Sequence, residues 1–204
     1  MTPTSSTSQP QQPLAMRFGR TTVAVTIGDV FSADAEAIVI PANRRGMMVA
    51  GIAGHVRLRA GFQIERDLMQ QAPLTLGTSV ATGSGELAQG GVRMLLHAVV
   101  FDDLGGSTRL DIVEKAMASA LESADRHRVR SIAVPPIGSG VGTGRLSQDD
   151  VYAAIVDAIA AHIRRFSSRI DRISIVCSGQ RDARTVFGLV EQAHALWWQL
   201  RTSR

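Results

Sequence analysis

Short apolar segments rich in β-branched residues alternate along this chain with longer segments whose apolar residues recur at helical spacing. The short segments are typical of strands, and the longer ones of amphipathic helices. Strands that alternate with helices of this length predict an α/β sheet covered on both faces, with ligands bound at loops beyond the strand ends. The expected strands span residues 21–27, 37–40, 78–82, 94–100, 131–135 and 172–177. The expected helices begin near His55, Thr108, Ser147 and Asp182.

A glycine-rich segment, residues 135–145 (PPIGSGVGTGR), lies between an expected strand and an expected helix. Its glycines alternate with small residues, so backbone N–H groups stay uncovered and can converge on an anion. The spacing is not G-x-G-x-x-G, and no Gly-Lys-Ser or Gly-Lys-Thr follows, which disfavours a dinucleotide dehydrogenase and a P-loop. A phosphate cradle and a simple tight connection both fit this segment. Residues 42–54 form a second glycine-bearing loop that leads into a helix.

The length of 204 residues, with 45% hydrophobic and 20% charged content, fits one domain with a full core. Residues 1–16 are rich in Ser, Thr, Gln and Pro and are expected to form a disordered tail. Residues 17–200 are expected to form the domain, including a C-terminal helix, and residues 201–204 a second tail. No run approaches the ~18 apolar residues of a membrane span, so we expect a cytoplasmic protein without a membrane partner.

Cysteine and lysine are each present once, as Cys177 and Lys115. A single cysteine excludes an internal disulfide and a multi-cysteine zinc site, and we expect neither a metal nor a cofactor. The formal net charge of +4 therefore comes almost wholly from arginine. These arginines are spread along the chain without a dense basic run or interleaved aromatic residues, so we do not expect nucleic acid as a partner. The oligomeric state stays open.

Five short motifs follow one another in the order of a known family. They are Gly28-Asp29-Val30, residues 37–43 (AIVIPAN), 51–54 (GIAG), 77–82 (GTSVAT) with His97-Ala98-Val99, and 136–142 (PIGSGVG). Together they resemble the macrodomain family, an ADP-ribose-binding module, over roughly residues 23–176. The combination is specific although each motif alone is weak. The resemblance implies a three-layer α/β/α fold with a mixed, mostly parallel central sheet.

The resemblance also implies a ligand, ADP-ribose or an ADP-ribosylated molecule, and a role for each matching residue. The Asp29 carboxylate would accept hydrogen bonds from the adenine amino group, and the backbone N–H of Val30 would donate to the adenine ring. Backbone N–H groups of the two loops would enclose the diphosphate and the distal ribose, which Asn43 would also reach. The loop residues are Gly51, Ile52 and Ala53 on one side and Gly138, Ser139, Gly140, Val141 and Gly142 on the other.

The sequence departs from the catalytic forms of the family. Members that hydrolyse ADP-ribosyl esters carry an aspartate in the first loop where this chain has Ala53, whose methyl group cannot accept a proton. A lysine-dependent form is disfavoured because Lys115 lies in an expected helix, and a zinc-dependent form because there is one cysteine. We therefore predict a binding module that resembles a bacterial subgroup lacking the catalytic loop aspartate.

Two other functions stay open. One is an ADP-ribosyl or O-acetyl-ADP-ribose hydrolase in which Asn43 acts with a substrate-assisted water, and Asp102 and Asp103 are candidates by position alone. His97 lies in an apolar strand and is expected to be a core histidine rather than a base. The other is a nucleic-acid or poly-ADP-ribose binding module that uses dispersed arginines. Those arginines are Arg44, Arg45, Arg126, Arg128 and Arg130.

Overall fold

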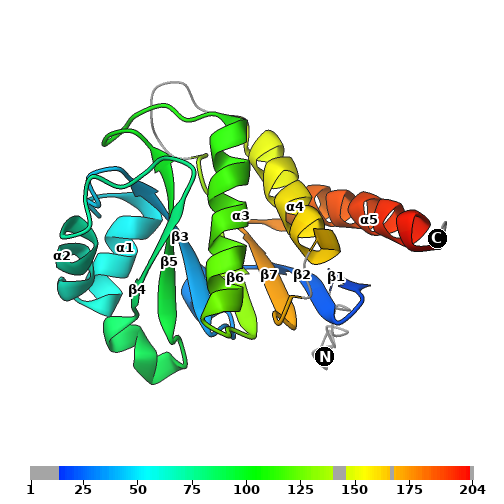
Figure 1. The fold of residues 1–204 in the computed structure, drawn as a ribbon, viewed down its shortest axis with the longest axis horizontal. Helices are drawn as coiled ribbons and strands as arrows, with labels where there is room; N and C mark the ends of the chain where they lie inside the picture. Colours follow the sequence, from blue (N-terminus) through cyan, green and yellow to red (C-terminus); the bar gives the residue numbers. More distant parts are fainter. Residues whose placement is uncertain (1–13, 140–145, 166–167, 203–204) are drawn as a thin grey trace, which may run out of the picture.

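The computed structural model describes residues 14–139, 146–165 and 168–202, which form strands and helices in alternation (Figure 1). The strands are β1 (Leu14–Phe18), β2 (Thr21–Ile27), β3 (Ala37–Asn43), β4 (Ser79–Gly83), β5 (Met94–Phe101), β6 (Ser131–Val134) and β7 (Arg172–Cys177). The α-helices are α1 (Gly51–Ala60), α2 (Gln63–Met69), α3 (Leu110–Arg126), α4 (Gln148–Arg165) and α5 (Gln180–Thr202). Two short 3₁₀ helices are η1 (Val30–Ser32) and η2 (Gly85–Gly90).

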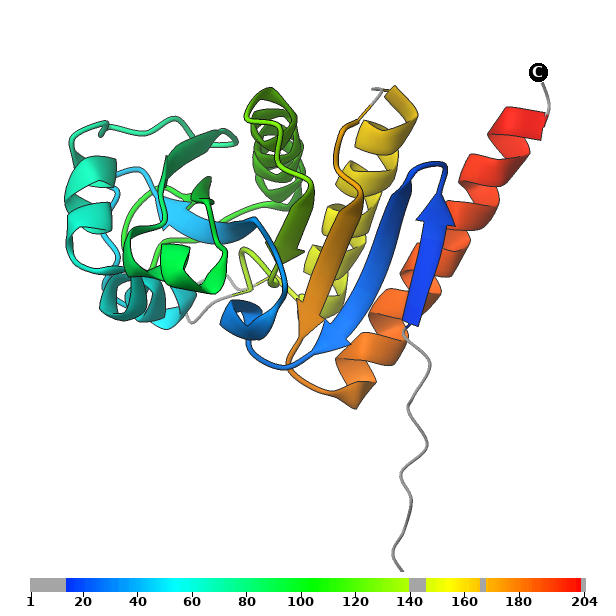
Figure 2. The ribbon, with the colours of Figure 1, turned by 90° about the horizontal axis from the view of Figure 1, so that it is seen from below.

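The strands of the described residues form one seven-stranded sheet in the order β1-β2-β7-β6-β3-β5-β4. The five inner strands run parallel, while β1 and β4 pair antiparallel at the two edges. Helices α3, α4 and α5 cover one face of the sheet, and α1 and α2 cover the other (Figure 1, Figure 2). The predicted three-layer fold with a mixed, mostly parallel sheet is confirmed.

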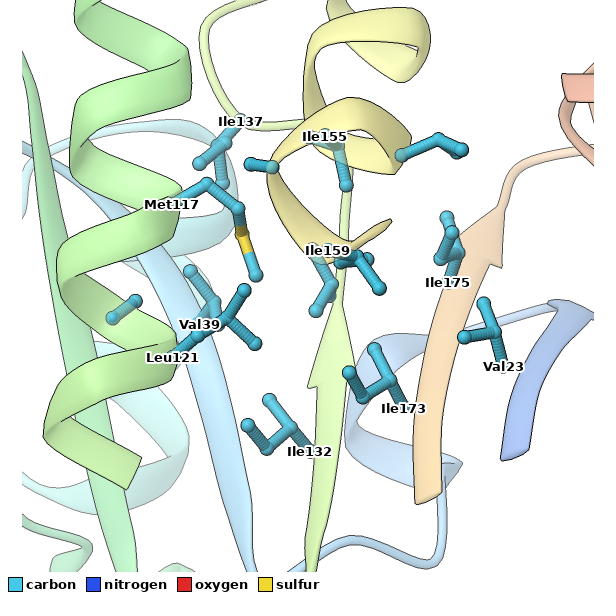
Figure 3. Packing of buried hydrophobic residues seen from close by; sticks show 14 of the residues in the cluster. Val23, Val39, Met117, Leu121, Ile132, Ile137, Ile155, Ile159, Ile173 and Ile175 are labelled. Atoms are coloured by element: carbon cyan, nitrogen blue, oxygen red, sulfur yellow. The ribbon is translucent and has the colours of Figure 1, made fainter. Parts of the chain in front are cut away.

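Two apolar cores lie on the two faces of the sheet because successive strand residues point to opposite sides. In β3, Val39 packs into the core beneath α3, α4 and α5, whereas Ile38 and Ile40 pack into the core beneath α1 and α2. Figure 3 shows Val39 together with Met117 of α3 and Ile159 of α4, and all three are almost fully buried. Burial of each such side chain stabilises the fold by about 1.5–3 kcal/mol. The cores therefore fix the strand ends from which the loops extend.

Strand β1 is the strand of the described sheet that the sequence pattern does not predict. Its sequence, LAMRF, contains no β-branched residue, so it lacks the usual strand signal. Tertiary contacts hold it instead: β1 pairs with β2, and the buried Phe18 ring meets Trp197 of α5 with 5.8 Å between ring centroids. The first strand thus begins at Leu14, inside the segment expected as a tail, and residues 1–13 lie outside the described residues.

The helix expected near His55 begins four residues earlier, at Gly51. It ends at Ala60, and the φ of +96° at the C-cap residue Gly61 breaks the helical path before α2 starts. At the other end of the chain, α5 continues to Thr202 and so enters the segment expected as a second tail. Within the described residues, none of the helices combines the length and apolarity needed to cross a membrane.

Candidate functional site

A cavity of about 400 Å³ opens at the carboxyl-terminal edge of the sheet. This volume lies within the range of small-molecule sites in proteins. Its walls come from the ends of β3 and β5 and from the segments that follow β3, β5 and β6, so residues distant in sequence meet here. They are residues 41–43, Met47, residues 49–53, Phe101, residues 103–106, Pro136, Gly138 and Ser139. Most of these lining residues are apolar, so the few polar groups among them determine which ligand the cavity can bind.

The N-terminus of α1 forms one wall of the cavity. Ala50, at the N-cap position, makes no side-chain capping bond, and the next three residues, Gly51, Ile52 and Ala53, all line the cavity. Within the described residues, no group accepts a hydrogen bond from their backbone N–H groups. Gly51 has φ of +57°, which favours glycine, and no atom lies within 4 Å of where a Cβ would stand. Unpaired N–H groups at a helix start attract anions.

Asn43 ends β3 and shapes the loop that leads to α1. Its side chain is buried, and Oδ1 accepts hydrogen bonds from the backbone N–H groups of Arg45 at 3.0 Å and Met47 at 3.3 Å. Its Nδ2 donates to the Met47 carbonyl at 2.8 Å. One N–H of the amide therefore remains for a ligand in the cavity that Asn43 lines. The geometry makes Asn43 first of all a residue that positions the loop.

Gly138 and Ser139, in the glycine-rich segment that follows β6, form another part of the cavity wall. Gly138 has φ of +98°, and a Cβ there would lie 2.9 Å from Cγ2 of Val113 in α3. Close packing on α3 and left-handed geometry thus both require glycine. The Ser139 hydroxyl donates to the Pro136 carbonyl at 3.3 Å. The predicted ligand residues Gly140, Val141 and Gly142 lie outside the described residues.

Asp29 and Val30 do not line the cavity. The Asp29 carboxylate is engaged through both oxygens: Oδ1 accepts from the Phe31 N–H at 3.1 Å, and Oδ2 pairs with Arg59 of α1 at 3.1 Å. Arg59 also lies over the Phe31 ring, 4.6 Å from its centroid. The structure therefore brings the two loops and Asn43 together around the cavity, and it places the predicted adenine residues further along α1.

The end of β5 and the loop after it form a wall in which Asp103 is the only residue predicted from the sequence. Phe101, Leu104, Gly105 and Gly106 also line the cavity. The sequence could have indicated this wall, because the loop follows the carboxyl end of a buried strand, where α/β proteins bind ligands. Asp103 is the one titratable side chain among the described lining residues.

Two exposed ion pairs connect the ends of β3 and β5 at the rim of the cavity. Arg44 contacts Asp102 at 3.0 Å, and Arg45 contacts Asp103 at 3.4 Å. Asp103 also accepts a hydrogen bond from the Leu104 N–H at 2.7 Å. Exposed pairs of this kind add little stability. The Arg45 contact and the Leu104 N–H together orient the Asp103 carboxylate at the cavity wall.

His97 lies inside β5 and is fully buried. Its Nε2 is 2.8 Å from the Thr82 hydroxyl, and Nδ1 has no partner among the described residues. Burial lowers the pKa of His97 to about 3, because the charged ring would lose its hydration. The ring is neutral at physiological pH and does not line the cavity, as expected for a core histidine. Within the described residues, no cluster of three or more His, Cys, Asp or Glu side chains can hold a metal ion.

The pKa of His97 predicts a specific loss of stability in acid. The unfolded chain binds a proton at His97 below pH ~6.5, whereas the folded protein does not until about pH 3, so stability falls as pH drops between these values. We expect His97 to account for about 2 kcal/mol between pH 6.5 and pH 5. His97→Gln, which does not titrate, should flatten the pH dependence of urea unfolding by this amount. An identical pH slope in both proteins would contradict the assignment.

Comparison with known proteins agrees with this geometry. The family model for the Macro domain matches residues 39–155, more than half of the chain, so the protein belongs to the macrodomain family. An uncharacterized protein of Aquifex aeolicus is 36% identical over 120 residues, which are 59% of this chain and 71% of that protein. One of Aeropyrum pernix is 36% identical over 61% of this chain and 64% of its own length. One of Mycobacterium tuberculosis is 33% identical over 66% of this chain, but the chain spans only 36% of it.

Solved structures share the fold. The Oceanobacillus iheyensis macrodomain with ADP has a TM-score of 0.74 at 17% identity, over 91% of this chain and 96% of that chain. The Trypanosoma brucei macrodomain in complex with ADP-ribose has a TM-score of 0.70 at 22% identity, over 82% of this chain and 68% of that chain. At these identities the likeness concerns the fold alone.

Proposed function

We propose that this macrodomain binds ADP-ribose or an ADP-ribosylated molecule and lacks the aspartate-dependent hydrolase machinery. The observation that carries the proposal is the uncapped N-terminus of α1, whose first three residues line the cavity. Backbone N–H groups at that position suit a diphosphate. The Trypanosoma brucei macrodomain, which has the same fold, is a complex with ADP-ribose. The methyl group of Ala53 in this wall supports a binding role, because it supplies no base.

In this proposal the ligand extends along α1. The distal ribose occupies the cavity near Asn43, the diphosphate lies at the start of α1, and the adenine lies toward Asp29. Asp29 pairs with Arg59, eight residues after Gly51, which corresponds to about 12 Å along a helix. An extended ligand with a purine at one end fits this separation. Because both Asp29 oxygens are engaged, the adenine amino group must share the carboxylate with Arg59 or displace it.

Titration calorimetry tests the proposal directly. ADP-ribose should give saturable heat, and AMP, which lacks the diphosphate and the distal ribose, should bind much more weakly. NAD serves as a second comparison, since its nicotinamide enlarges the group that must enter the cavity. Absence of heat with ADP-ribose at high micromolar concentration means that the proposed function is wrong.

Asp29→Ala tests the adenine contact. Loss of a hydrogen bond to a charged group costs about 1.5–3 kcal/mol, so ADP-ribose affinity should fall about 10- to 100-fold in calorimetry. Asp34→Ala is the matched control, because Asp34 is an exposed carboxylate in the same segment. Arg59→Ala removes the competing guanidinium and should retain ADP-ribose binding. Unchanged affinity in Asp29→Ala would place the adenine elsewhere.

A hydrolase of ADP-ribosyl esters is the second candidate, and Asp103 is the observation that favours it. This carboxylate lines the cavity and is held there by Arg45, so it is placed to activate a water. Release of ADP-ribose from O-acetyl-ADP-ribose that stops in Asp103→Asn would establish this role. Asn43→Ala is a weaker test, because Asn43 also shapes the loop. Lack of turnover across a panel of such esters would remove the candidate.

A further inference from the structure

Arginines that are far apart in the sequence gather at the amino-terminal edge of the sheet, opposite the cavity. They stand where inner strands begin and where α3 and α4 end, and all are exposed. We propose that this arginine edge is a second binding surface, which takes the phosphate backbone of a nucleic acid. Its members are Arg20, Arg126, Arg128, Arg130, Arg164, Arg165, Arg169 and Arg172.

The positive charge of the molecule is concentrated at this edge. The adjoining segments contribute four carboxylates, Glu36, Glu122, Asp125 and Asp171, and a ninth arginine, Arg93, which pairs with Glu36, so an excess of five positive charges remains. The whole chain has a formal net charge of only +4. The remainder of the molecule is therefore slightly acidic. Such an asymmetry steers a polyanion toward the arginine edge.

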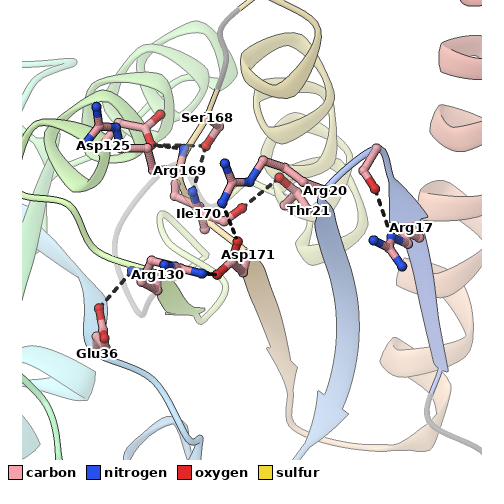
Figure 4. A network of polar contacts seen from close by, with 11 residues as sticks. Arg17, Arg20, Thr21, Glu36, Asp125, Arg130, Ser168, Arg169, Ile170 and Asp171 are labelled. Carbon is pink, nitrogen blue, oxygen red and sulfur yellow. Dashed lines mark hydrogen bonds and ion pairs between the residues drawn. The ribbon is translucent and has the colours of Figure 1, made fainter.

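The carboxylates at this edge are held by contacts within the protein (Figure 4). Asp171 is shared between the guanidinium groups of Arg20 and Arg130. Glu36 accepts a hydrogen bond from the backbone N–H of Arg130 at 2.8 Å. Asp125 accepts two hydrogen bonds from the turn that leads into β7. These acidic groups organise the turns, and they leave most of the arginines without a counter-charge.

Five guanidinium groups of the arginine edge make no ion pair with any residue that the structure describes. Arg126 and Arg164 lie in the last turns of α3 and α4, where a cation favours the helix dipole, so helix stability accounts for their presence. Arg128, Arg169 and Arg172 lie outside the helices, so stabilisation of a helix dipole does not account for their positive charge. An unpaired guanidinium in water is available for a phosphate, which it binds through two parallel N–H donors.

Arg128 adds an independent observation, because its backbone is strained. Its φ is +57°, the left-handed conformation that glycine usually takes after a helix. The Arg128 N–H bonds to the Asp125 carbonyl at 3.1 Å, and the Val129 N–H bonds to the Ala124 carbonyl at 2.9 Å, which together close α3. Glycine would close the helix equally well and without strain. An exposed arginine kept in such a conformation points to binding.

The arginine edge suits the repeated phosphates of a nucleic acid, because its exposed guanidinium groups are spread over several strand and helix ends. Contacts with phosphates and little sequence preference are therefore expected. In the sequence these arginines look dispersed, and only the parallel strands bring them together. Exposed apolar side chains lie near one side of this edge, on the last turns of α5, where Trp197 packs close to Gly19 beside Arg20. They are Leu196, Trp198 and Leu200.

Fluorescence anisotropy with a labelled 20-base-pair DNA duplex tests the proposal on the full chain. The natural protein should bind at 50 mM salt and lose affinity steeply as salt rises. Arg126→Gln, Arg164→Gln and Arg169→Gln together should weaken binding about tenfold or more and reduce the salt slope by about 2–3. The matched control replaces three exposed arginines of α2 and α5 with glutamine and should bind the duplex as the natural protein does. These are Arg66, Arg181 and Arg184.

The outcomes separate this proposal from the proposed function. Calorimetry with ADP-ribose should give the same affinity in the natural protein and both triple variants, because the cavity lies at the other end of the strands. No duplex binding at 50 mM salt, or equal weakening in the control triple variant, would overturn the arginine edge. Binding to phosphatidylserine vesicles with none to DNA would overturn it in favour of a lipid surface.

Arg128→Gly is the sharpest single substitution. Glycine relieves the left-handed strain, so the midpoint of thermal unfolding should rise or stay level, while duplex affinity should fall severalfold with the loss of one cation. A merely structural arginine would show no loss of duplex affinity. That result would remove Arg128 from the proposed surface.

Discussion

An Ala53→Asp variant is expected to hydrolyse O-acetyl-ADP-ribose at least about a hundredfold faster than the natural chain, because general-base catalysis contributes about 10²–10⁴-fold. Ala53 lines the cavity at the third position of α1, so a carboxylate there would face a ligand in the cavity. It would also lie in the first turn of a helix, where an acidic side chain favours folding by about 0.3–1 kcal/mol. Release of ADP-ribose, followed by chromatography, measures the gain.

Ala53→Asn is the matched control for this gain. The amide has nearly the size of the carboxylate but cannot accept the proton of a water, so its rate should stay at that of the natural chain. The ADP-ribose affinity of both variants, measured by calorimetry, shows whether each substitution leaves binding intact. If Ala53→Asp binds ADP-ribose and still does not turn over the ester, then position 53 does not present a base to the reacting bond.

The second large effect is a loss of stability in Gly85→Ala. Gly85 has φ of +53°, and a Cβ there would lie 1.9 Å from the carbonyl oxygen of Ala60, the last residue of α1. The obstacle is backbone, so α1 and η2 must separate. Overpacking and left-handed strain together predict a loss of about 3 kcal/mol or more in the free energy of unfolding. Urea unfolding followed by circular dichroism measures this difference.

Gly90→Ala is the control, because Gly90 lies in the same 3₁₀ helix and has no atom within 4 Å of an added Cβ. Its stability should remain within about 0.5 kcal/mol of the natural protein. Equal losses in the two variants would indicate that the whole η2 segment is intolerant, and that the close approach of Gly85 to α1 is not the cause.

Most of the sheet could be predicted because its strands carry local signals. Residues 21–27 and 172–177 are predicted with the observed bounds, since β-branched runs end there at changes of composition. Strand β1 could not be predicted, because its stability comes from pairing with β2 and from contacts with α5 rather than from its own sequence.

The cavity could be predicted in part. Its glycine loops carry a sequence pattern, and Asn43, Gly51 and Gly138 all line it. The wall after β5 depends on the register that places Phe101 beside the end of β3, and no local signal encodes that register. The Asp29 ion pair with Arg59 likewise joins residues from separate elements, so only the folded chain reveals it.

The pairing of β2 with β7 has a consequence for synthesis of the protein on the ribosome. Val23 and Val25 pair with Ile173 and Ile175, about 150 residues later in the chain. Until the last strand leaves the ribosome, β2 has only β1 beside it, and an isolated hairpin of this kind is marginally stable in water. Strands β1 and β2 can therefore join the rest of the sheet only after nearly the whole polypeptide has been synthesised.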